Sequence, residues 1–371
     1  MWLVLFAVLA HIHLARCSVL GDGENPSEPA EHTGNKPNIV IIMADDVGTG
    51  DLHFWNGLNS SLVDTPNLQA LASKGIVFTD AHSTPLCAPS RYMLLSGNYA
   101  HRGRRPYGTW NINAGSNQFA KNQKSIAEVL RDQGGYETAM FGKWHLGGKI
   151  PPDGMQSLNI SNILTHAGHD WSFPLIEGPG DIGFDHSYIT PAGIQDPPYS
   201  FFRNDYLEIL SSDAKYWRGG QYPMKSGTSV INITKEGEGD PNWDSSSYDM
   251  ILVNETEAFI DHHQVNRPND PFFAYVALGA VHIPHSPPTS WGLDGGSQVK
   301  GKYPTEHLDM VGAMDKAVGS IVQIIEDRGL AGNTLIIFTS DNGGLNIAAT
   351  VEAGHETGGV LRGYKGSIWE G

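Results

Sequence analysis

Cys87 lies at the predicted start of a short helix, in the run Cys87-Ala-Pro-Ser-Arg91. Pro89 suits the first turn of a helix, and Gly97 suits the left-handed residue that ends one. Free backbone N–H groups at a helix N-terminus favour an anion, and Arg91 adds a fixed cation one turn further in. The position indicates an activated nucleophile or a group made from one. A small buried residue beside a turn is the ordinary alternative.

Acidic side chains follow two predicted strands at their carboxyl ends. Asp45 and Asp46 end one apolar run, and Asp341 and Asn342 follow another. Two adjacent carboxylates repel one another unless a cation holds them, although turn formation is the alternative. Ligands bind at the carboxyl ends of parallel strands, and these oxygen ligands suit a hard cation such as Ca²⁺ or Mg²⁺. Cysteine and histidine are too sparse in spaced pairs to predict a zinc site.

Lysine and histidine side chains follow two further predicted strands. Lys143 and His145 occupy one strand-end loop, and His282 and His285 occupy another. An ordinary surface role is the alternative for the first pair. Because these loops also follow strands at their carboxyl ends, we expect them at the same edge of a sheet as the acids.

The elements that must position these residues alternate along the chain. Continuous apolar runs predict strands over 38–44, 76–79, 137–141, 271–278 and 334–339. Caps and helical periodicity predict helices over 66–75, 89–97, 125–134, 249–262 and 305–329. This alternation predicts an α/β fold with a doubly wound, mostly parallel sheet and helices on both faces. The segment 149–247 has poor periodicity and is predicted to form long loops over one face.

Composition and charge exclude several classes of partner. The formal net charge of −16 argues against nucleic acid and against an acidic membrane surface. An anionic substrate would therefore need local cations. The length of 371 residues suits one large domain or a domain and a half, and no segment after the N-terminus is apolar enough to be transmembrane.

The N-terminus predicts a secretory route. Residues 1–18 are predicted to be a signal peptide, because a short apolar run precedes small residues. Residues 19–36 are polar and rich in Gly, Pro and Glu, and they are predicted to be a flexible lead-in. Glycosylation sequons agree with this route, at Asn59, Asn159, Asn232 and Asn254. If Cys17 leaves with the signal peptide, the mature chain keeps Cys87 alone, and an unpaired thiol in an oxidising compartment calls for an explanation.

The sequence resembles the sulfatase family from residue 37 to its end. The run from Cys87 to Arg91 matches the Cys-x-Pro-Ser-Arg signature of that family, and 135–145 resembles its second signature. Further family blocks follow in family order, at 45–51, His282-x-Pro284, 341–344 and 365–371. The resemblance implies an alkaline-phosphatase-like fold and a catalytic domain over 37–371. Because Gly371 falls inside the last block, we expect the smaller C-terminal subdomain of the family to be missing.

The resemblance explains the unpaired cysteine. It implies that a formylglycine-generating enzyme oxidises Cys87 to formylglycine during secretion, and that the aldehyde hydrates to a geminal diol. By the same resemblance, one hydroxyl of the diol would attack sulfur and displace the alcohol, and the second would expel sulfate as the aldehyde re-forms.

The family roles transfer to matching residues of this sequence. The resemblance implies one Ca²⁺, with Mg²⁺ possible, held by Asp45, Asp46, Asp341, Asn342 and an oxygen of modified Cys87. Arg91 and His145 would hold the diol, and Lys143 and Lys365 would neutralise the sulfate oxygens. His282 or Lys365 would protonate the leaving alcohol, whereas His285 is expected to be only a neighbour.

The implied function is hydrolysis of a sulfate ester, either an aryl or a carbohydrate sulfate, in the manner of arylsulfatases. One alternative is a phosphodiesterase or phosphonate hydrolase of the same superfamily, although a single metal with several cations favours the monoanionic sulfate group. The other is an inactive, truncated binding protein that is secreted. An extracellular and a lysosomal location are equally compatible with the sequence.

Overall fold

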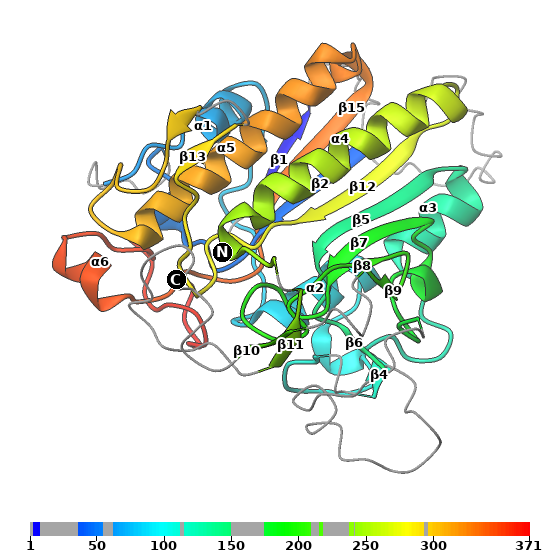
Figure 1. Cartoon of the computed structure of the whole chain (residues 1–371), viewed down its shortest axis with the longest axis horizontal. Helices are drawn as coiled ribbons and strands as arrows, with labels where there is room; N and C mark the ends of the chain where they lie inside the picture. The colour runs from blue at the N-terminus through cyan, green and yellow to red at the C-terminus, as the bar shows by residue number, and fades with distance from the viewer. Residues whose placement is uncertain are drawn as a thin grey trace, which may run out of the picture.

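The computed structural model describes residues 3–7, 36–54, 62–111, 115–149, 174–208, 215–217, 237–240, 242–292 and 296–371. In this part of the chain the central feature is a nine-stranded sheet (Figure 1). Its strands, in spatial order, are β3 (Ile76–Val77), β1 (Leu3–Ala7), β15 (Thr334–Ser340), β2 (Asn38–Ala44), β12 (Phe272–Ala277), β5 (Glu137–Lys143), β7 (His186–Thr190), β8 (Phe202–Arg203) and β9 (Tyr206–Leu207).

The middle of the sheet is parallel. The strands β15, β2, β12, β5 and β7 pair in parallel with their neighbours, and the outer pairs are antiparallel. Parallel strands are covered on both faces, which explains the uninterrupted apolar runs of β2 and β12. Their carboxyl ends therefore lie along one edge, where the predicted site residues follow them.

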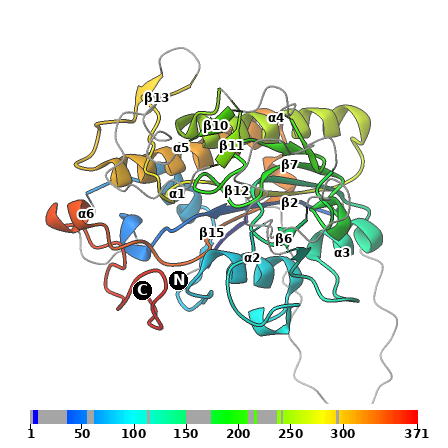
Figure 2. The same ribbon diagram turned by 60° about the horizontal axis from the view of Figure 1, so that its bottom comes forward.

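Helices cover both faces of the sheet (Figure 2). One face packs against α1 (Pro66–Ser73), α4 (Tyr248–Asn266) and α5 (Glu306–Asp327). The other packs against α2 (Cys87–Ser96) and α3 (Ile126–Gly134). Alternate residues of one strand divide between the two cores, as with Ile42 and Met43 of β2. The doubly wound α/β architecture predicted from the sequence is confirmed.

Shorter elements complete the described chain. They are β4 (Ser116–Asn117), β6 (Gly147–Gly148), β10 (Lys215–Trp217), β11 (Gly237–Gly239), β13 (Ser290–Trp291), β14 (Ser297–Gln298), α6 (Ala348–Glu352) and short 3-10 turns. None of the helices in the described ranges is both long and apolar enough to cross a membrane.

The predicted helix ends follow their capping residues. The Ser125 hydroxyl accepts a hydrogen bond from the Glu128 amide at 2.9 Å, and the Thr305 hydroxyl accepts one from the Leu308 amide at 3.3 Å. Gly97 ends α2 with a φ of 65°, as its sequence position predicts.

The predicted long loops over 149–247 are partly wrong. Residues 186–190 form β7, which pairs with β5, and β8 and β9 extend the sheet beyond it. Residues 150–173 lie outside the described ranges, as do most of 209–236. A strand of five residues that begins with His and Ser gives little apolar signal on its own.

The N-terminal predictions are only partly within the described residues. Residues 3–7 of the predicted signal peptide form β1, between β3 and β15, and residues 8–35 lie outside the described ranges. Of the sequons, Asn254 is exposed on α4. The sequons at Asn59, Asn159 and Asn232 also lie outside the described residues.

Candidate active site

The residues predicted to do chemistry meet at the carboxyl edge of the parallel strands. Four strands and one helix carry most of them. Asp45 and Asp46 follow β2, Lys143 and His145 lie at the end of β5, and His282 follows β12. Asp341 and Asn342 follow β15, and Cys87 and Arg91 lie in the first turns of α2. Lys365 reaches the same place from the C-terminal loops, where its ammonium group contacts Asp46. Residues from six distant parts of the chain thus form one cluster.

Three cations pair with three carboxylates in this cluster. Lys143 Nζ lies 2.6 Å from Asp45 Oδ2, and Arg91 donates to Asp341 Oδ2 through Nε at 3.0 Å and Nη2 at 2.6 Å. Lys365 Nζ lies 2.6 and 2.8 Å from the two carboxylate oxygens of Asp46. Removal of one member of a buried ion pair leaves the charge of its partner uncompensated, so the two side chains of each pair depend strongly on one another.

Glycine at position 142 brings Lys143 into this cluster. Gly142 has a φ of 95°, and a Cβ atom there would collide with the carbonyl oxygen of Ala277 on the adjacent strand β12. Only glycine accepts both conditions. The Lys143 ammonium is consequently held beside Asp45, and this carboxylate raises the pKa of Lys143 although burial by itself would lower it.

Two non-glycine residues of the site have left-handed backbone. Asp46 has a φ of 66° and His145 a φ of 52°. The Asp46 amide donates to Asp341 Oδ1 at 3.2 Å, and Asn342 Nδ2 donates to Asp46 Oδ1 at 2.8 Å. Such backbone costs of order 1–3 kcal/mol per residue and persists where surrounding contacts hold it, which is common at functional sites.

Two oxygens of the acidic group have no hydrogen-bond partner. Asp45 Oδ1 and Asn342 Oδ1 are both buried and have no hydrogen-bond partner, although Arg91 Nη2 lies 3.7 Å from Asp45 Oδ1. Buried polar atoms are nearly always hydrogen-bonded, so these two oxygens are candidates for ligands of a cation. Ligand atoms of Asp45, Cys87 and Asp341 also lie within 4.8 Å of one another. The donor set is dominated by oxygen and fits a hard divalent cation.

Cys87 faces a histidine. Its Sγ lies 3.2 Å from His145 Nδ1, and both residues are buried. Burial raises the pKa of the Cys87 thiol. Burial, with Lys143 and Arg91 close by, lowers the pKa of His145 well below its ordinary value. The unmodified pair is therefore a neutral thiol and a neutral imidazole, which is a poor nucleophile with a weak base.

His282 presents one ring nitrogen to the acidic group. Its Nδ1 lies 2.7 Å from the carbonyl oxygen of Ile283, so Nδ1 carries the proton and Nε2 faces Asp46 Oδ2 at 3.6 Å. Burial lowers the pKa of His282 well below its ordinary value despite Asp46. His285 instead packs against His307, with ring centroids 5.1 Å apart and the two rings tilted by 54°.

Two buried aspartates support the site and were missed in the sequence. Asp249 of α4 accepts hydrogen bonds from the amides of Gly279 and Ala280 at 2.7 and 3.1 Å, and so fixes the turn before His282. Asp51 links the loop after β2 to the C-terminal loops. Its carboxylate accepts a hydrogen bond from the Gly48 amide at 2.8 Å. It also contacts Thr357 Oγ1 at 2.5 Å and His355 Nε2 at 2.8 Å. The acidic motif contained Asp51, but its partners are far along the chain.

Comparison of the sequence with known protein families identifies the family of this chain. Residues 37–369 match the family described as Sulfatase. The chain belongs to the sulfatase family. This sulfatase chain is 27% identical over 368 residues to an N-acetylgalactosamine-6-O-sulfatase of Bacteroides thetaiotaomicron, covering 90% of the chain and 65% of that relative. It is 29% identical over 394 residues to human arylsulfatase D, covering 93% of the chain and 60% of that relative. It thus spans less than two thirds of the length of both relatives.

Solved structures agree with the fold of this chain. A protein of Bacteroides thetaiotaomicron, described in connection with the metabolism of multiple glycosaminoglycans, has a TM-score of 0.72 and 27% identity, covering 91% of this chain and 70% of that chain. A Pseudoalteromonas sulfatase has a TM-score of 0.60 at 22% identity, covering 91% of this chain and 60% of that one, and supports the fold alone. The predicted alkaline-phosphatase-like α/β fold is confirmed.

Proposed function

We propose that this chain hydrolyses sulfate esters, with a sulfated carbohydrate or an aryl sulfate as substrate. The observation that carries the proposal is the meeting of Arg91, Lys143 and Lys365 beside Cys87 in a protein of net charge −16. An anionic ester can bind such a protein only where local positive charge outweighs the overall field. The three cations balance the carboxylates of Asp45, Asp46 and Asp341, and a divalent cation on those carboxylates would supply the positive excess. The named activities of the relatives, an N-acetylgalactosamine-6-O-sulfatase and an arylsulfatase, support this class of substrate.

The acidic group is proposed to hold one divalent cation, Ca²⁺ or Mg²⁺. Asp45, Asp46, Asp341 and Asn342 would supply its oxygen ligands, together with an oxygen of modified Cys87. Asp45 Oδ1 and Asn342 Oδ1, which are buried without a hydrogen-bond partner, support this ligand set. When bound, such an ion supplies Lewis-acid stabilisation of developing negative charge.

Cys87 is proposed to be the precursor of formylglycine. The raised pKa of its thiol supports this proposal, because a neutral buried thiol is a weak nucleophile. The hydrated aldehyde would supply a hydroxyl nucleophile at the start of α2. His145 Nδ1 lies 3.2 Å from the sulfur in the unmodified chain. It would hold that group in place together with the Arg91 guanidinium.

The remaining residues would act on the ester itself. Lys143 and Lys365 would bind the sulfate oxygens through their ammonium groups. His282 Nε2 faces the acidic group while the Ile283 carbonyl fixes the proton on Nδ1, so His282 would protonate the leaving alcohol only after Nε2 gains a proton of its own. Lys365 Nζ already carries protons and is the alternative donor.

We also propose that the protein follows the secretory route, to an extracellular or lysosomal destination, and meets a formylglycine-generating enzyme on the way. The apolar N-terminus and the sequons support this route. Cleavage of residues 1–18 would remove β1 from the sheet. Intact mass of protein secreted from a eukaryotic host, before and after deglycosylation, tests both points; a retained N-terminus would contradict the proposed signal peptide.

Two measurements test the proposed function. The peptide that carries Cys87, from protein made in a secretory host, should resist thiol alkylation and show an aldehyde-bearing residue by mass spectrometry. Hydrolysis of a chromogenic aryl sulfate should exceed that of a phosphate diester, and chelation of the metal should abolish it. An alkylatable thiol in active enzyme would contradict the formylglycine proposal. Preference for the phosphate diester would contradict the proposed substrate class. Binding of sulfated sugars without hydrolysis would contradict the proposed activity.

A further inference from the structure

A second group of metal-ligating side chains lies at the opposite edge of the sheet. Glu137 is the first residue of β5, and Lys143 of the candidate active site is the last. A strand of this length separates the two ends by about 20 Å. The second group is therefore distinct from the acidic cluster described above, and neither the proposed catalysis nor its proposed metal uses it.

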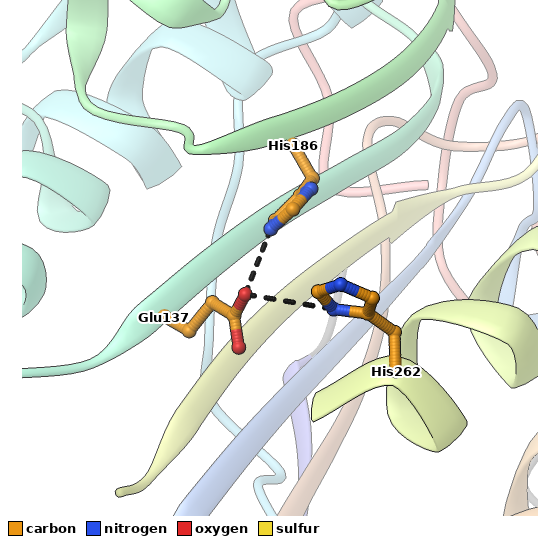
Figure 3. A group of neighbouring side chains, drawn as sticks. All are labelled: Glu137, His186 and His262. Atoms are coloured by element: carbon orange, nitrogen blue, oxygen red, sulfur yellow. Dashed lines mark hydrogen bonds and ion pairs between the residues drawn. The ribbon is translucent and has the colours of Figure 1, made fainter. Parts of the chain in front are cut away.

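Two imidazole rings converge on one carboxylate oxygen in this group (Figure 3). His186 Nε2 lies 2.8 Å from Glu137 Oε1, and His262 Nδ1 lies 4.0 Å from the same atom. The three ligand atoms lie within 4.8 Å of one another. The carboxylate is buried with 5% of its side chain exposed, whereas the side chains of His186 and His262 are 36% and 55% exposed. An ion could thus reach the group from solvent and meet a charge at its base.

The fold dictates this convergence. Residues two apart on a strand point to the same face, and His186 is the register partner of Ala139, two residues after Glu137. Glu137 and His186 are consequently diagonal neighbours on one face of β5 and β7. That face is covered by α4, and His262 lies in the last turns of this helix. Three separate elements therefore contribute one ligand each.

A second layer of contacts fixes the carboxylate. Its other oxygen, Glu137 Oε2, lies 2.5 Å from Nδ1 of the buried His263. His263 Nε2 lies 2.9 Å from the carbonyl oxygen of Asp270, so this nitrogen donates. Both nitrogens of His263 are thereby occupied, and Glu137 Oε1 is left for His186 and His262. Hydrogen-bonded outer partners of this kind orient the ligands of metal sites.

We propose that Glu137 Oε1, His186 Nε2 and His262 Nδ1 bind a transition-metal ion of the zinc class. Two imidazoles and one carboxylate suit Zn²⁺ rather than Ca²⁺ or Mg²⁺. Ligands about 2.0–2.1 Å from a tetrahedral ion lie roughly 3.3 Å apart, and the observed 2.8 and 4.0 Å lie on either side of that value. The exposed side leaves the fourth position to water. The ion would tie the beginnings of β5 and β7 to the end of α4.

The ordinary alternative is a hydrogen-bonded histidine–glutamate network without metal. Isothermal titration of the full chain with Zn²⁺, in the presence of excess Ca²⁺ that occupies the oxygen site, separates the two. We expect a zinc-binding step in wild type and at least a tenfold weaker one in His262→Ala. His262 is exposed and its nearest acid is 4.0 Å away, so this variant should fold. His101→Ala, which removes an exposed histidine far along the chain, is the matched control and should bind as wild type does.

A second readout reports the ligand set directly. Co²⁺ in place of Zn²⁺ should give the visible absorption of a tetrahedral site in wild type and in His101→Ala, and lose it in His262→Ala and His186→Ala. Zn²⁺ should also raise the melting temperature of wild type by about 3–4 °C at about 100 times the dissociation constant. Absence of a zinc-binding step in wild type, or equal affinity in wild type and His262→Ala, would overturn the proposal.

Discussion

The ammonium group of Lys365 contacts both carboxylate oxygens of Asp46, at 2.6 and 2.8 Å. Asp46 is one of the proposed ligands of the divalent cation. Burial by itself would raise the pKa of Asp46, but His282 and Lys365 lower it below its ordinary value, so the carboxylate is charged. The ammonium group and a bound ion therefore compete for the same oxygens. Lys365 would have to turn toward a bound sulfate when the ion is present.

Replacement of Lys365 by Met should therefore have opposite effects on metal binding and on turnover. Removal of a positive charge next to the ligands should tighten Ca²⁺ binding by about tenfold or more. Loss of a preorganised cation should lower turnover by roughly 10²–10³. Titration with Ca²⁺ and an aryl sulfate assay measure the two effects. Lys74→Met, at an exposed lysine on the surface, is the control. Weaker Ca²⁺ binding in Lys365→Met would show that the two cations do not compete.

Asp341→Asn should remove the response to Ca²⁺ and weaken the fold. Arg91 donates twice to Asp341 Oδ2, and both side chains are fully buried. An asparagine leaves this guanidinium partly uncompensated, which costs about 3–5 kcal/mol of the free energy of unfolding. Urea denaturation with and without Ca²⁺ measures both effects. Glu352→Gln changes the same charge at an exposed position, and it should keep the calcium-dependent gain in stability. An equal gain in Asp341→Asn would exclude Asp341 as a ligand.

Asp51→Asn should destabilise the loops that carry Lys365. The Asp51 Oδ2 atom accepts hydrogen bonds from the Gly48 amide and the Thr357 hydroxyl, and Oδ1 faces His355 Nε2. An asparagine has only one oxygen, so one of these two positions loses its acceptor. Leaving such a buried donor unsatisfied costs about 1–3 kcal/mol. Displacement of the loop should also lower turnover by about tenfold or more. Thr357→Ser keeps the hydroxyl and is the conservative control. Unchanged stability and turnover in Asp51→Asn would show that this link does not position Lys365.

The sequence predicts the parallel core of this protein well, for a physical reason. Strands buried on both faces must be apolar throughout, and β2, β12 and β15 each show that as an unbroken run. Polar residues directly after such runs then fall at one edge of the sheet, which is why the cluster around Asp45 and Asp341 could be predicted. β7 lacks this signal, because it carries His and Ser among its five residues.

Contacts that do not lie at the carboxyl ends of the apolar strands could not be predicted from the sequence. Glu137, His186 and His262 have no regular spacing along the chain, since each comes from a different element. The sparse pairs of cysteine and histidine therefore gave no sign of a second metal-binding group. Asp249 likewise looks like an ordinary first-turn acid of α4, and only the fold brings it to the amides of Gly279 and Ala280.

Asp205 should make the stability of the protein fall as the pH rises from about 4 to about 6. Burial, with Asp181 nearby, raises the pKa of Asp205 to about 6, and Asp205 Oδ1 has no hydrogen-bond partner. A carboxyl group whose pKa is higher in the folded than in the unfolded state binds more protons when folded. Its contribution is therefore fully present below the unfolded pKa and is lost by pH 7.

Asp205→Asn isolates this contribution, because an asparagine stays neutral at every pH. The variant should gain about 1–2 kcal/mol relative to wild type between pH 4 and pH 7, after allowance for partial exposure of the group. Asp205 has a φ of 69°, which asparagine also tolerates, so any effect of backbone conformation is the same at both pH values and cancels. Urea denaturation of both proteins at the two pH values measures the difference, and an equal effect of the substitution at pH 4 and pH 7 would show that Asp205 titrates normally.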